Sequence, residues 1–390
     1  MKVLMINSVC GIRSTGRICS DIAELLKKNG HECKIAYGRE IVPRKYQKDA
    51  IRIGNKFSVK LDALKTRLLD NAGFNSKRAT KKFIEWIKEY NPDVIHLHNL
   101  HGYYINIDIL FSYLKTCGKK VVWTLHDCWP LTGHCAYFDS VHCEQWKNGC
   151  ERCTRKGEYP KSILLNRAKR NYQKKKGLFA DIPNMVIVTP SQWLADLVKK
   201  SLLKRSEVRV IPNGVSLEHF QVTESDLREK YGLQEKTILL GVASTWAKHK
   251  GFHDFIALAG MLESNYQIVL IGVTKKQITE LPPQIIAIER TNNVKELAQW
   301  YSTADVFINP TYEDNYPTVN LEAQACGIPV VTYATGGSVE SVPKCNIVEK
   351  GNLEEMRRML YDRAYSTKIS QDVVLNKDAC YHRYLELYEE

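Results

Sequence analysis

Apolar and polar residues along the chain follow the pattern of an α/β protein. Residues 2–7 form a short apolar stretch that predicts a strand, and residues 18–28 have helical spacing with one apolar face. Gly30 ends this helix, and residues 33–37 begin the next strand. A strand, a helix and a second strand in this order predict a parallel sheet that helices cover on both faces.

The alternation continues to a turn signal at residues 212–214, Pro-Asn-Gly. It is interrupted at about residues 127–160 by a loop rich in cysteine, histidine and aromatic residues, and a basic helical segment at 161–176 follows. The other predicted elements of this half are helices at 83–90, 108–114 and 192–200 and strands at 94–97, 120–125, 185–188 and 208–211.

A second alternating series follows the turn. It predicts strands at 237–242, 266–271, 306–309 and 329–333 and helices at 252–262, 294–302 and 320–326. We therefore expect a domain at 1–211 that carries the insertion at 127–160, a second domain at 212–375, and a helix at 376–390 that packs back toward the first domain. Two such halves predict a cleft between the carboxyl ends of two sheets, where open α/β folds bind ligands.

Length and composition agree with two globular domains. The chain has 390 residues, of which 44% are hydrophobic and 25% charged, so wholesale disorder is excluded. Its formal net charge of +13 is unevenly distributed, because residues 1–200 carry 36 basic and 18 acidic side chains whereas residues 201–390 carry 20 and 25. The first half is therefore expected to meet an anionic partner, unless this surface is simply a solvated, lysine-rich one.

The sequence also indicates a cellular location. The chain opens without the long apolar core of a secretory signal, and no stretch reaches the ~20 apolar residues of a membrane span. We expect a cytoplasmic protein whose twelve cysteines are largely reduced. The basic segment at 161–179, with apolar Ile163, Leu164, Leu165 and Phe179, suits either a solvated helix or a helix on anionic lipid.

Three segments have the residue types of a phosphate- and nucleotide-binding site. Residues 11–17 join the first strand to the first helix and contain two glycines, but Arg17 stands where a Walker A loop needs lysine. Residues 244–251 carry Lys248 and Lys250 between a strand and a helix, where an ammonium could neutralise a diphosphate. Residues 311–322 carry Asp314 and Glu322, and a carboxylate at the start of a helix can accept both hydroxyls of a ribose.

At these segments the sequence resembles the family 4 retaining glycosyltransferases, which have the GT-B fold of two Rossmann-like domains facing across a cleft. The resemblance covers most of the chain, and the similar segments are residues 126–135, 189–194, 211–215, 248–251, 314–322, 323–331 and 335–337. The most specific of these is Ala-Cys-Gly-Ile-Pro-Val-Val at 325–331, preceded by an acidic pair eight positions apart. The N-terminal segments are similar to the branch that builds bacterial surface polysaccharides such as capsule or O-antigen.

The resemblance implies a role for each matching residue of the second half. Lys250 would bind the donor diphosphate, and Lys248 would replace an arginine that the family usually carries nearby. Glu322 would hold the ribose, Asp314 would face the donor sugar as a catalytic residue, and Asn315 would belong to the donor site.

The first half supplies the remaining site residues. By resemblance, His126 would touch the transferred sugar near the reaction centre, and Gly16 would offer its N–H to a phosphate. His98 and Asn99 follow a predicted strand and are acceptor-side candidates, although histidines in this position are often only hydrogen-bonded residues of a cleft.

The implied activity is that of a retaining, hexosyltransferase-type glycosyltransferase. A nucleotide-sugar donor would give its sugar to a hydroxyl of a saccharide, often a lipid-linked one at the inner face of the cytoplasmic membrane, as a peripheral membrane protein. Because lysines and backbone N–H groups can stabilise the phosphate charge, we expect no cofactor to be required for catalysis.

Four cysteines of the insertion form a separate pattern. Cys135, Cys143, Cys150 and Cys153 end in the Cys-x2-Cys spacing of tetrahedral zinc sites, so they could hold a structural zinc ion rather than a catalytic one. Free thiols or an occasional disulfide are the alternatives.

Two other classes of function remain open at this point. Another GT-B enzyme, a sugar phosphorylase or a nucleotide-sugar epimerase, would share the fold. A nucleic-acid-binding protein could use the basic half and the cysteine knuckle, but no basic and aromatic base-stacking residues are interleaved there, so we expect no nucleic-acid partner.

Overall fold

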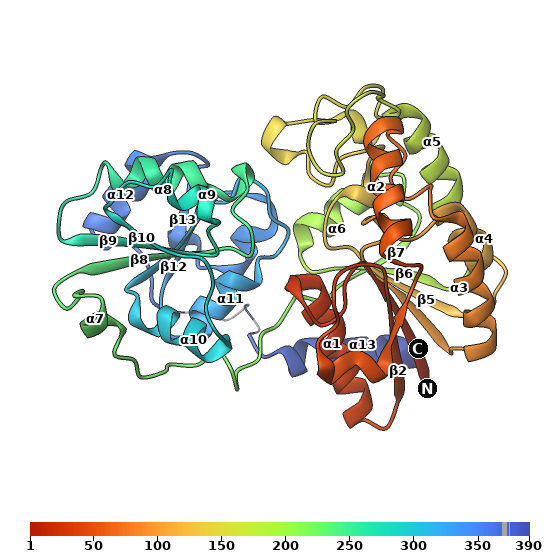
Figure 1. Ribbon diagram of the computed structural model, residues 1–390, viewed down its shortest axis with the longest axis horizontal. Coiled ribbons are helices and arrows are strands. Elements are labelled where there is room, and N and C mark those ends of the chain that lie inside the picture. Colours follow the sequence, from red (N-terminus) through yellow and green to blue (C-terminus); the bar gives the residue numbers. More distant parts are fainter. Residues whose placement is uncertain (369–372, 374) are drawn as a thin grey trace. The chain divides into compact units, whose positions relative to one another are not determined.

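The computed structural model divides the chain into two compact units. The structure describes residues 1–368, 373 and 375–390, so residues 369–372 and 374 of the predicted second domain lie outside it. The first unit contains Met1–Pro212 and Tyr381–Glu390, and the second contains Asn213–Cys380 (Figure 1). No helix in the described part of the chain is both long and apolar enough to span a membrane.

The first unit is built on a seven-stranded sheet in which all neighbouring strands are parallel. In spatial order its strands are β3 (Ala50–Arg52), β2 (Glu32–Tyr37), β1 (Lys2–Asn7), β4 (Val94–Leu97), β5 (Lys120–Thr124), β6 (Met185–Thr189) and β7 (Glu207–Val210). The central strands β1, β4, β5 and β6 are almost completely buried, as a sheet covered on both faces requires. The predicted parallel sheet is therefore confirmed.

Six helices of the first unit follow the crossover pattern of parallel strands. They are α1 (Arg13–Lys28), α2 (Lys56–Leu69), α3 (Lys77–Tyr90), α4 (Ile107–Leu114), α5 (Ala168–Phe179) and α6 (Gln192–Lys199). Aromatic packing joins α4 and α5 to the sheet, since the Phe111 ring lies 4.5 Å from that of Phe179 and the Trp123 ring of β5 lies 4.9 Å from it.

The second unit contains a six-stranded parallel sheet. Its spatial order is β10 (Ile285–Ile288), β9 (Tyr266–Ile271), β8 (Thr237–Val242), β11 (Val306–Asn309), β12 (Val330–Tyr333) and β13 (Ile347–Val348). Its helices are α7 (Leu227–Lys230), α8 (Phe252–Ala259), α9 (Lys275–Ile278), α10 (Val294–Thr303), α11 (Thr318–Ala325) and α12 (Leu353–Tyr361). One core cluster contains residues of α10 and α11 and another contains residues of α8 and α12, so both faces of this sheet are covered.

The last helix, α13 (Lys377–Glu389), passes from the second unit into the first. From the part that belongs to the first unit, the Tyr384 hydroxyl lies 3.0 Å from Thr124 Oγ1 at the end of β5. The Tyr388 hydroxyl lies 2.6 Å from His96 Nδ1 in β4. The helix thus contributes buried hydroxyl groups to the first sheet.

The basic segment at 161–179 differs from the single lipid-facing helix considered above. Helix α5 begins only at Ala168, and its Tyr172, Lys175 and Phe179 are buried in the core. The apolar residues 163–165 are exposed but lie before the helix. An amphipathic helix over the whole segment is therefore wrong, because Phe179 is needed to fill the space between α4 and the sheet.

Candidate active site

In the second unit the predicted donor residues lie where strands of the sheet end. Lys248 and Lys250 belong to a short 3-10 turn, Lys248–Lys250, between β8 and α8, and Asp314 lies between β11 and α11. The Lys250 Nζ lies 2.5 Å from Asp314 Oδ2, and the two side chains are 29% and 13% exposed. The structure therefore brings the predicted diphosphate lysine and the predicted catalytic carboxylate together within one unit.

The two loops that carry this pair are held together by their backbones. The Tyr312 N–H donates to the His249 carbonyl at 2.8 Å. Gly251 has φ +74°, and a Cβ at this position would lie 2.3 Å from the Pro310 carbonyl oxygen, so only glycine allows the loops to approach this closely. The position of Lys250 relative to Asp314 is thus fixed by the chain on both sides.

Glu322 lies in α11, the helix that follows Asp314, and is buried. Its Oε2 accepts a hydrogen bond of 3.0 Å from the Tyr301 hydroxyl, which comes from α10. A buried carboxylate needs such partners, because burial without them disfavours its charged form.

The other two predicted donor residues differ in their surroundings. Lys248 is exposed, so it is free to turn toward a ligand. Asn315 is buried, and its backbone N–H donates to Asp314 Oδ1 at 2.9 Å. Asn315 therefore helps to orient the carboxylate that pairs with Lys250.

A buried polar network beneath this site could not be recognised from the sequence. Asn309 Nδ2, at the end of β11, donates to Asn320 Oδ1 at 2.8 Å, and Asn320 Nδ2 in turn donates to Ser341 Oγ at 2.9 Å and Ser338 Oγ at 3.3 Å. Thr332 Oγ1 of β12 bonds to the Asn309 carbonyl at 2.9 Å. Each of these polar side chains has partners, so the network orients the start of α11 on the sheet.

In the first unit the predicted site residues also follow the carboxyl ends of strands. Gly16 lies in α1 after β1, His98 and Asn99 follow β4, and His126 follows β5. Asn7, the last residue of β1, connects two of these loops, since its Oδ1 accepts from the Asn99 N–H at 3.2 Å and its Nδ2 donates to the Val9 carbonyl at 2.8 Å.

The glycine-rich loop turns into helix earlier than the sequence predicts. Helix α1 begins at Arg13, and its N-cap residue, Ile12, offers no side-chain cap. Arg13 has φ +57°, outside the helical region, so Gly16 lies in the first turn of α1, where backbone N–H groups are open to a ligand. A phosphate contact at Gly16 stays a prediction. Gly16 also allows close packing, because a Cβ there would lie 3.0 Å from the Val9 side chain.

Two histidines of the predicted acceptor side form a pair. His98 Nδ1 lies 2.9 Å from His126 Nε2, with the rings stacked at a centroid distance of 5.2 Å. Burial lowers the pKa of His126 to about 4 and that of His98 well below its usual value. Both rings are therefore neutral near pH 7 and act as hydrogen-bonding groups rather than as cations.

A neighbouring triad was not predicted. His101 Nε2 lies 2.7 Å from Asp127 Oδ2, and His101 Nδ1 lies 2.9 Å from the Tyr159 hydroxyl. Although burial raises the pKa of Asp127, interaction with His101 holds it below its ordinary value. The sequence places Asp127 directly after His126, but only the histidine was considered as a site residue.

The four cysteines of the insertion line one small cavity of about 20 Å³, together with His134. Nevertheless, among the residues that the structure describes, no three His, Cys, Asp or Glu side chains are arranged as metal ligands. All four thiols are free of disulfides. Structural zinc at Cys135, Cys143, Cys150 and Cys153 stays a prediction, which elemental analysis of protein purified without chelators tests.

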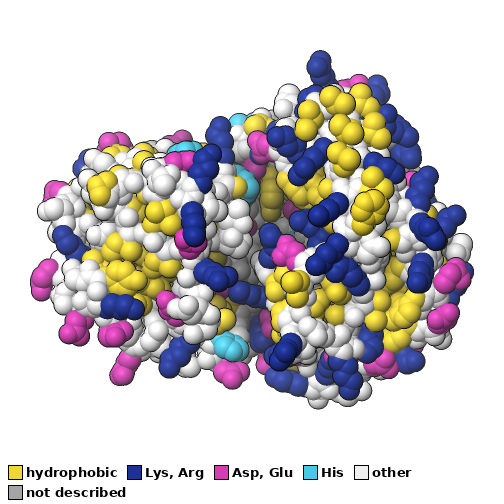
Figure 2. All heavy atoms as spheres, in the orientation of Figure 1, with side chains coloured by type: hydrophobic (Ala, Val, Ile, Leu, Met, Phe, Trp, Pro, Cys, Tyr) yellow, Lys and Arg dark blue, Asp and Glu magenta, His cyan; other side chains and the backbone are white. Residues whose placement is uncertain are grey.

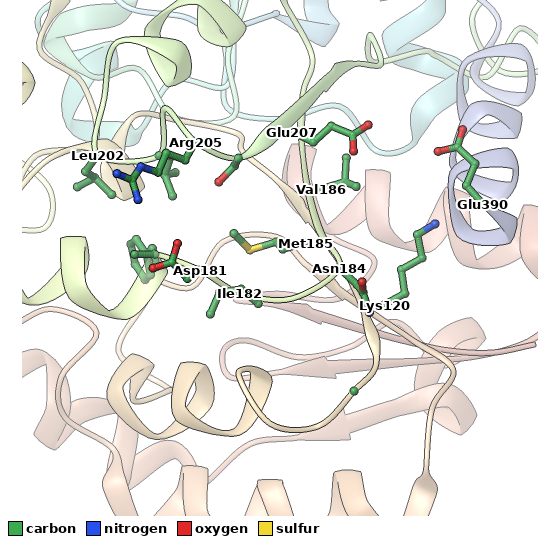
Figure 3. Close-up of a pocket in the computed structure, with 15 residues that line it drawn as sticks. Lys120, Asp181, Ile182, Asn184, Met185, Val186, Leu202, Arg205, Glu207 and Glu390 are labelled. Carbon is green, nitrogen blue, oxygen red and sulfur yellow. The ribbon is translucent and has the colours of Figure 1, made fainter.

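A larger cavity, of about 740 Å³, lies at the opposite edge of the first sheet (Figure 3). Its lining includes Lys120, Met185 and Glu207, which are the first residues of β5, β6 and β7. Because open α/β sheets bind ligands at the carboxyl ends of their strands, this cavity is separate from the candidate active site.

Two family models match the chain. The model described as Glycosyltransferase Family 4 matches residues 15–219, and the model described as Glycosyl transferases group 1 matches residues 223–358. The first match covers the His98, Asn99 and His126 loops, and the second covers Lys250, Asp314 and Glu322.

Curated relatives agree over part of their length. WcaC of Escherichia coli, assigned as a colanic acid biosynthesis glycosyl transferase, is 27% identical over 65% of this chain and 62% of its own. CapM of Staphylococcus aureus, a capsular polysaccharide biosynthesis glycosyltransferase, is 26% identical over 45% of this chain and 52% of its own. The matched part thus spans half to two thirds of these relatives.

Solved structures share the fold. HepE of Anabaena, solved in complex with UDP and glucose, covers 100% of this chain at a TM-score of 0.69 and 15% identity, with the match spanning all of HepE. The two parallel α/β domains and this likeness confirm the predicted GT-B fold. Together with the family model that spans more than half of the sequence, they show that the chain belongs to glycosyltransferase family 4.

Proposed function

We propose that this protein transfers a sugar from a nucleotide-diphosphate donor to a hydroxyl of a saccharide acceptor, with retention of the anomeric configuration, in the synthesis of a surface polysaccharide. The observation that carries the proposal is the Lys250–Asp314 ion pair, placed after β8 and β11 just before the helix that holds Glu322. The relatives WcaC and CapM, whose names refer to colanic acid and capsular polysaccharide, support the polysaccharide assignment.

Lys250 has the chemistry to stabilise a departing diphosphate. Its ammonium group is held by Asp314 at 2.5 Å, so it is already oriented before a ligand arrives. A diphosphate would share this ammonium with Asp314, and the preorganised charge would act most strongly on the leaving group as negative charge develops. The exposed Lys248 on the same turn would add a second positive charge.

Glu322 is suited to select the nucleoside. The Tyr301 hydroxyl donates a hydrogen bond of 3.0 Å to its Oε2, and a carboxylate at the start of a helix can accept hydrogen bonds from both hydroxyls of a ribose. The UDP bound to HepE makes UDP-glucose the first donor to try.

The transfer itself needs little covalent chemistry from the protein. The bond between the anomeric carbon and the diphosphate oxygen breaks while the acceptor hydroxyl forms a new bond on the same face of the sugar, and the hydroxyl proton passes to the departing diphosphate. His126, which is neutral, would hold a hydroxyl of the transferred sugar by a hydrogen bond. Asp314 would act through Lys250, the side chain that it orients.

We propose a lipid-linked saccharide as the acceptor and the inner face of the cytoplasmic membrane as the working place. The excess of 36 basic over 18 acidic side chains in residues 1–200 supports an anionic surface as partner. A soluble saccharide acceptor would not require this excess.

Release of nucleoside diphosphate from a panel of sugar nucleotides tests the donor assignment. Lys250→Ala should lower kcat roughly 100- to 1,000-fold, as does removal of one preorganised group that stabilises developing charge. Lys276→Ala, on the exposed surface of α9, is the matched control and should retain the wild-type rate. Equal rates in both variants would remove Lys250 from the proposed role.

A second variant separates nucleoside binding from chemistry. Glu322→Ala should raise the donor KM roughly 10- to 100-fold with a smaller change in kcat, because it loses charge-assisted hydrogen bonds to the ribose. Glu229→Ala, an exposed residue of α7, is the control. Proton NMR of the product tests retention, and an inverted anomeric configuration contradicts it.

A further inference from the structure

Helix α2 has its apolar side chains on the outside. Its two buried residues are polar, Asp62 and Thr66, whereas Phe57 and Leu64 are 73% and 53% exposed. A helix on the surface of a soluble protein ordinarily presents the opposite arrangement, with leucines against the core. The exposed face of α2 is therefore made to contact something apolar.

The exposed apolar residues of α2 form one stripe along the helix. Phe57, Leu61, Leu64 and Leu68 follow each other at four- and three-residue intervals, so they project from the same side. Four exposed basic residues accompany the stripe on the same helix: Lys56, Lys60, Lys65 and Arg67. Helical geometry places Lys60 on one flank and Lys65 on the other, and the one acidic residue of the helix, Asp62, is buried.

A second segment extends the stripe. The Ile163 N–H donates to the Arg67 carbonyl at 2.7 Å, and the Leu165 N–H donates to the Leu68 carbonyl at 3.3 Å. Ile163, Leu164 and Leu165 are all exposed, with Leu164 at 64%. We call the eight side chains of both segments the apolar ridge: Phe57, Leu61, Leu64, Leu68, Leu69, Ile163, Leu164 and Leu165.

Buried hydrogen bonds hold the ridge in place. Asp62 accepts from the Ser76 hydroxyl at 2.5 Å and from Asn75 Nδ2 at 3.1 Å. Asp70, which ends α2 in a left-handed conformation, accepts from the Arg167 N–H at 2.5 Å and contacts His134 of the insertion. The outward orientation of the leucines is thus determined by the polar contacts beneath them.

We propose that the apolar ridge docks on an anionic lipid bilayer, with Phe57, Leu64 and Leu164 entering the interface and Lys60 and Lys65 contacting lipid phosphates. Apolar residues flanked by lysines on a helix that lies in the plane of the surface have the composition of an interfacial element. Charge decides between the possible occupants, because repeated lysines without exposed carboxylates would repel an identical surface on a second copy but attract an anionic one. The biological role of this contact rests on the proposed function, whereas its physical basis rests only on the residues of the ridge.

Figure 2 shows hydrophobic side chains gathered over the part of the surface where α2 lies in Figure 1, with Lys and Arg side chains around them. The basic segment at 161–179, which the sequence suggested as a lipid-facing helix, does not expose such a face. Its helix α5 buries Tyr172, Lys175 and Phe179. The lipid contact is therefore assigned to α2 and residues 163–165 rather than to the basic helix.

Flotation with vesicles tests the ridge without requiring activity. The full chain is mixed with vesicles of phosphatidylcholine alone or with phosphatidylglycerol added, and the bound fraction is measured on a density gradient. Phe57→Ser with Leu64→Ser should lower the partition coefficient to anionic vesicles at least roughly tenfold, because two apolar anchors are lost. Ile41→Ser with Val222→Ser is the matched control, since these residues are 76% and 75% exposed and lie outside the ridge.

A charge-reversal pair tests the basic flanks. Lys60→Glu with Lys65→Glu should abolish the preference for vesicles that contain phosphatidylglycerol, whereas Lys275→Glu with Lys276→Glu on α9 should preserve it. Wild-type flotation by the ridge variants overturns the proposal. It is also overturned if the wild type does not float but elutes as a dimer that Phe57→Ser with Leu64→Ser converts to a monomer.

The two proposals fail separately. Release of nucleoside diphosphate with a water-soluble acceptor should be the same in the ridge variants and the wild type, because the ridge contains no residue of the candidate active site. Flotation without turnover of any sugar nucleotide would leave the ridge as a lipid-binding surface and remove the proposed function. Turnover of a sugar nucleotide without flotation would leave the proposed function in place and overturn the ridge as a lipid-binding surface.

Discussion

At the scale of single residues, the hydrogen bond between His98 and His126 determines which nitrogen of each ring carries a proton. His98 is buried, and in the described part of the chain its Nε2 has no hydrogen-bond partner. An unpaired acceptor nitrogen costs less in the interior than an unpaired N–H, which favours His98 with its proton on Nδ1. His98 then donates to His126 Nε2 at 2.9 Å, so His126 carries its own proton on Nδ1 and can donate it to a sugar hydroxyl.

This arrangement makes His98 a positioning residue whose role can be tested. His98→Phe removes the donor and should lower kcat about tenfold, the effect of about 1.4 kcal/mol, whereas the amide nitrogen of His98→Asn should restore most of the rate. Nitrogen-15 NMR of the His126 ring should report a change of tautomer in His98→Phe only. An unchanged tautomer in that variant contradicts the positioning role.

The buried histidines also predict how stability depends on pH. The folded-state pKa of His126 is lowered to about 4 from an unfolded value near 6.5, so the unfolded state binds more protons between these values. The free energy of unfolding should therefore fall as the pH decreases from about 6.5 toward 4, by up to about 1.4 kcal/mol per pH unit for each such histidine.

Burial lowers the pKa of His96 and His98 in the same direction, so they add to this slope. Urea unfolding at several pH values measures it. His126→Gln should reduce the slope relative to the wild type, and a slope unchanged by this substitution would show that His126 does not titrate as its burial requires.

The residues of the candidate donor site could be proposed from the sequence, whereas the network around them could not. Lys250, Asp314 and Glu322 are marked by their spacing between predicted strands and helices and by family resemblance. By contrast, Asn309, Asn320 and Ser341 are common residues that become informative only when three elements bring them together. The start of α1 at Arg13 also could not be located from apolar spacing alone.

At the scale of elements, α5 and the cysteine-rich insertion are joined by a buried lysine. Lys175 Nζ donates to the Trp129 carbonyl at 2.7 Å and to the Thr132 carbonyl at 2.9 Å, and it lies 3.4 Å from the centre of the Trp129 ring. Burial lowers its pKa to about 7. The insertion has little regular structure of its own. Lys175 therefore stabilises it by holding its first 3-10 turn, Trp129–Leu131.

Lys175→Ala should destabilise the first unit by about 3 kcal/mol, because it leaves two carbonyls without a partner and a cavity in the core. The control is Lys174→Ala on the same helix, whose side chain is 38% exposed and lies 3.6 Å from Asp108, and it should cost less than about 1 kcal/mol. Denaturant unfolding followed by tryptophan fluorescence compares them. Equal losses in the two variants would show that Lys175 does not anchor the insertion.

Helices and strands whose apolar residues face the core were predictable, and α2 shows why elements with an exposed apolar face were not. Strands β1, β4, β8 and β11 match their predictions because buried strands are continuous apolar runs. Helix α2 was missed because its leucines face outward and its inward face carries Asp62 and Thr66. Short elements such as β10 and β13 lack enough residues to show a period.

At the scale of the whole molecule, the positive charge for catalysis can come from the protein. Lys248 and Lys250 lie on one turn, and α1 begins with N–H groups that no side chain caps. Transfer should therefore persist in excess EDTA at close to the untreated rate. Loss of turnover in EDTA with recovery on addition of magnesium or manganese contradicts this expectation.

The two-unit architecture follows from the sequence, and the return of the last helix toward the first domain was expected, whereas the side chains that this helix contacts were not. Repeated alternation of strands and helices on either side of residues 212–214 indicates two sheets. In the first unit, the hydroxyls of Tyr384 and Tyr388 reach two buried side chains, Thr124 and His96. Such long-range pairs have no local signature in the sequence.

Because residues 381–390 complete the unit that begins at Met1, the second unit is inserted within the first, and both described chain ends belong to the same body. A molecule stretched by its two ends would therefore transmit force within the first unit, from β1 through β4 and β5 to α13. The second unit would bear no tension until that helix has been torn from the sheet, which makes α13 a mechanical latch.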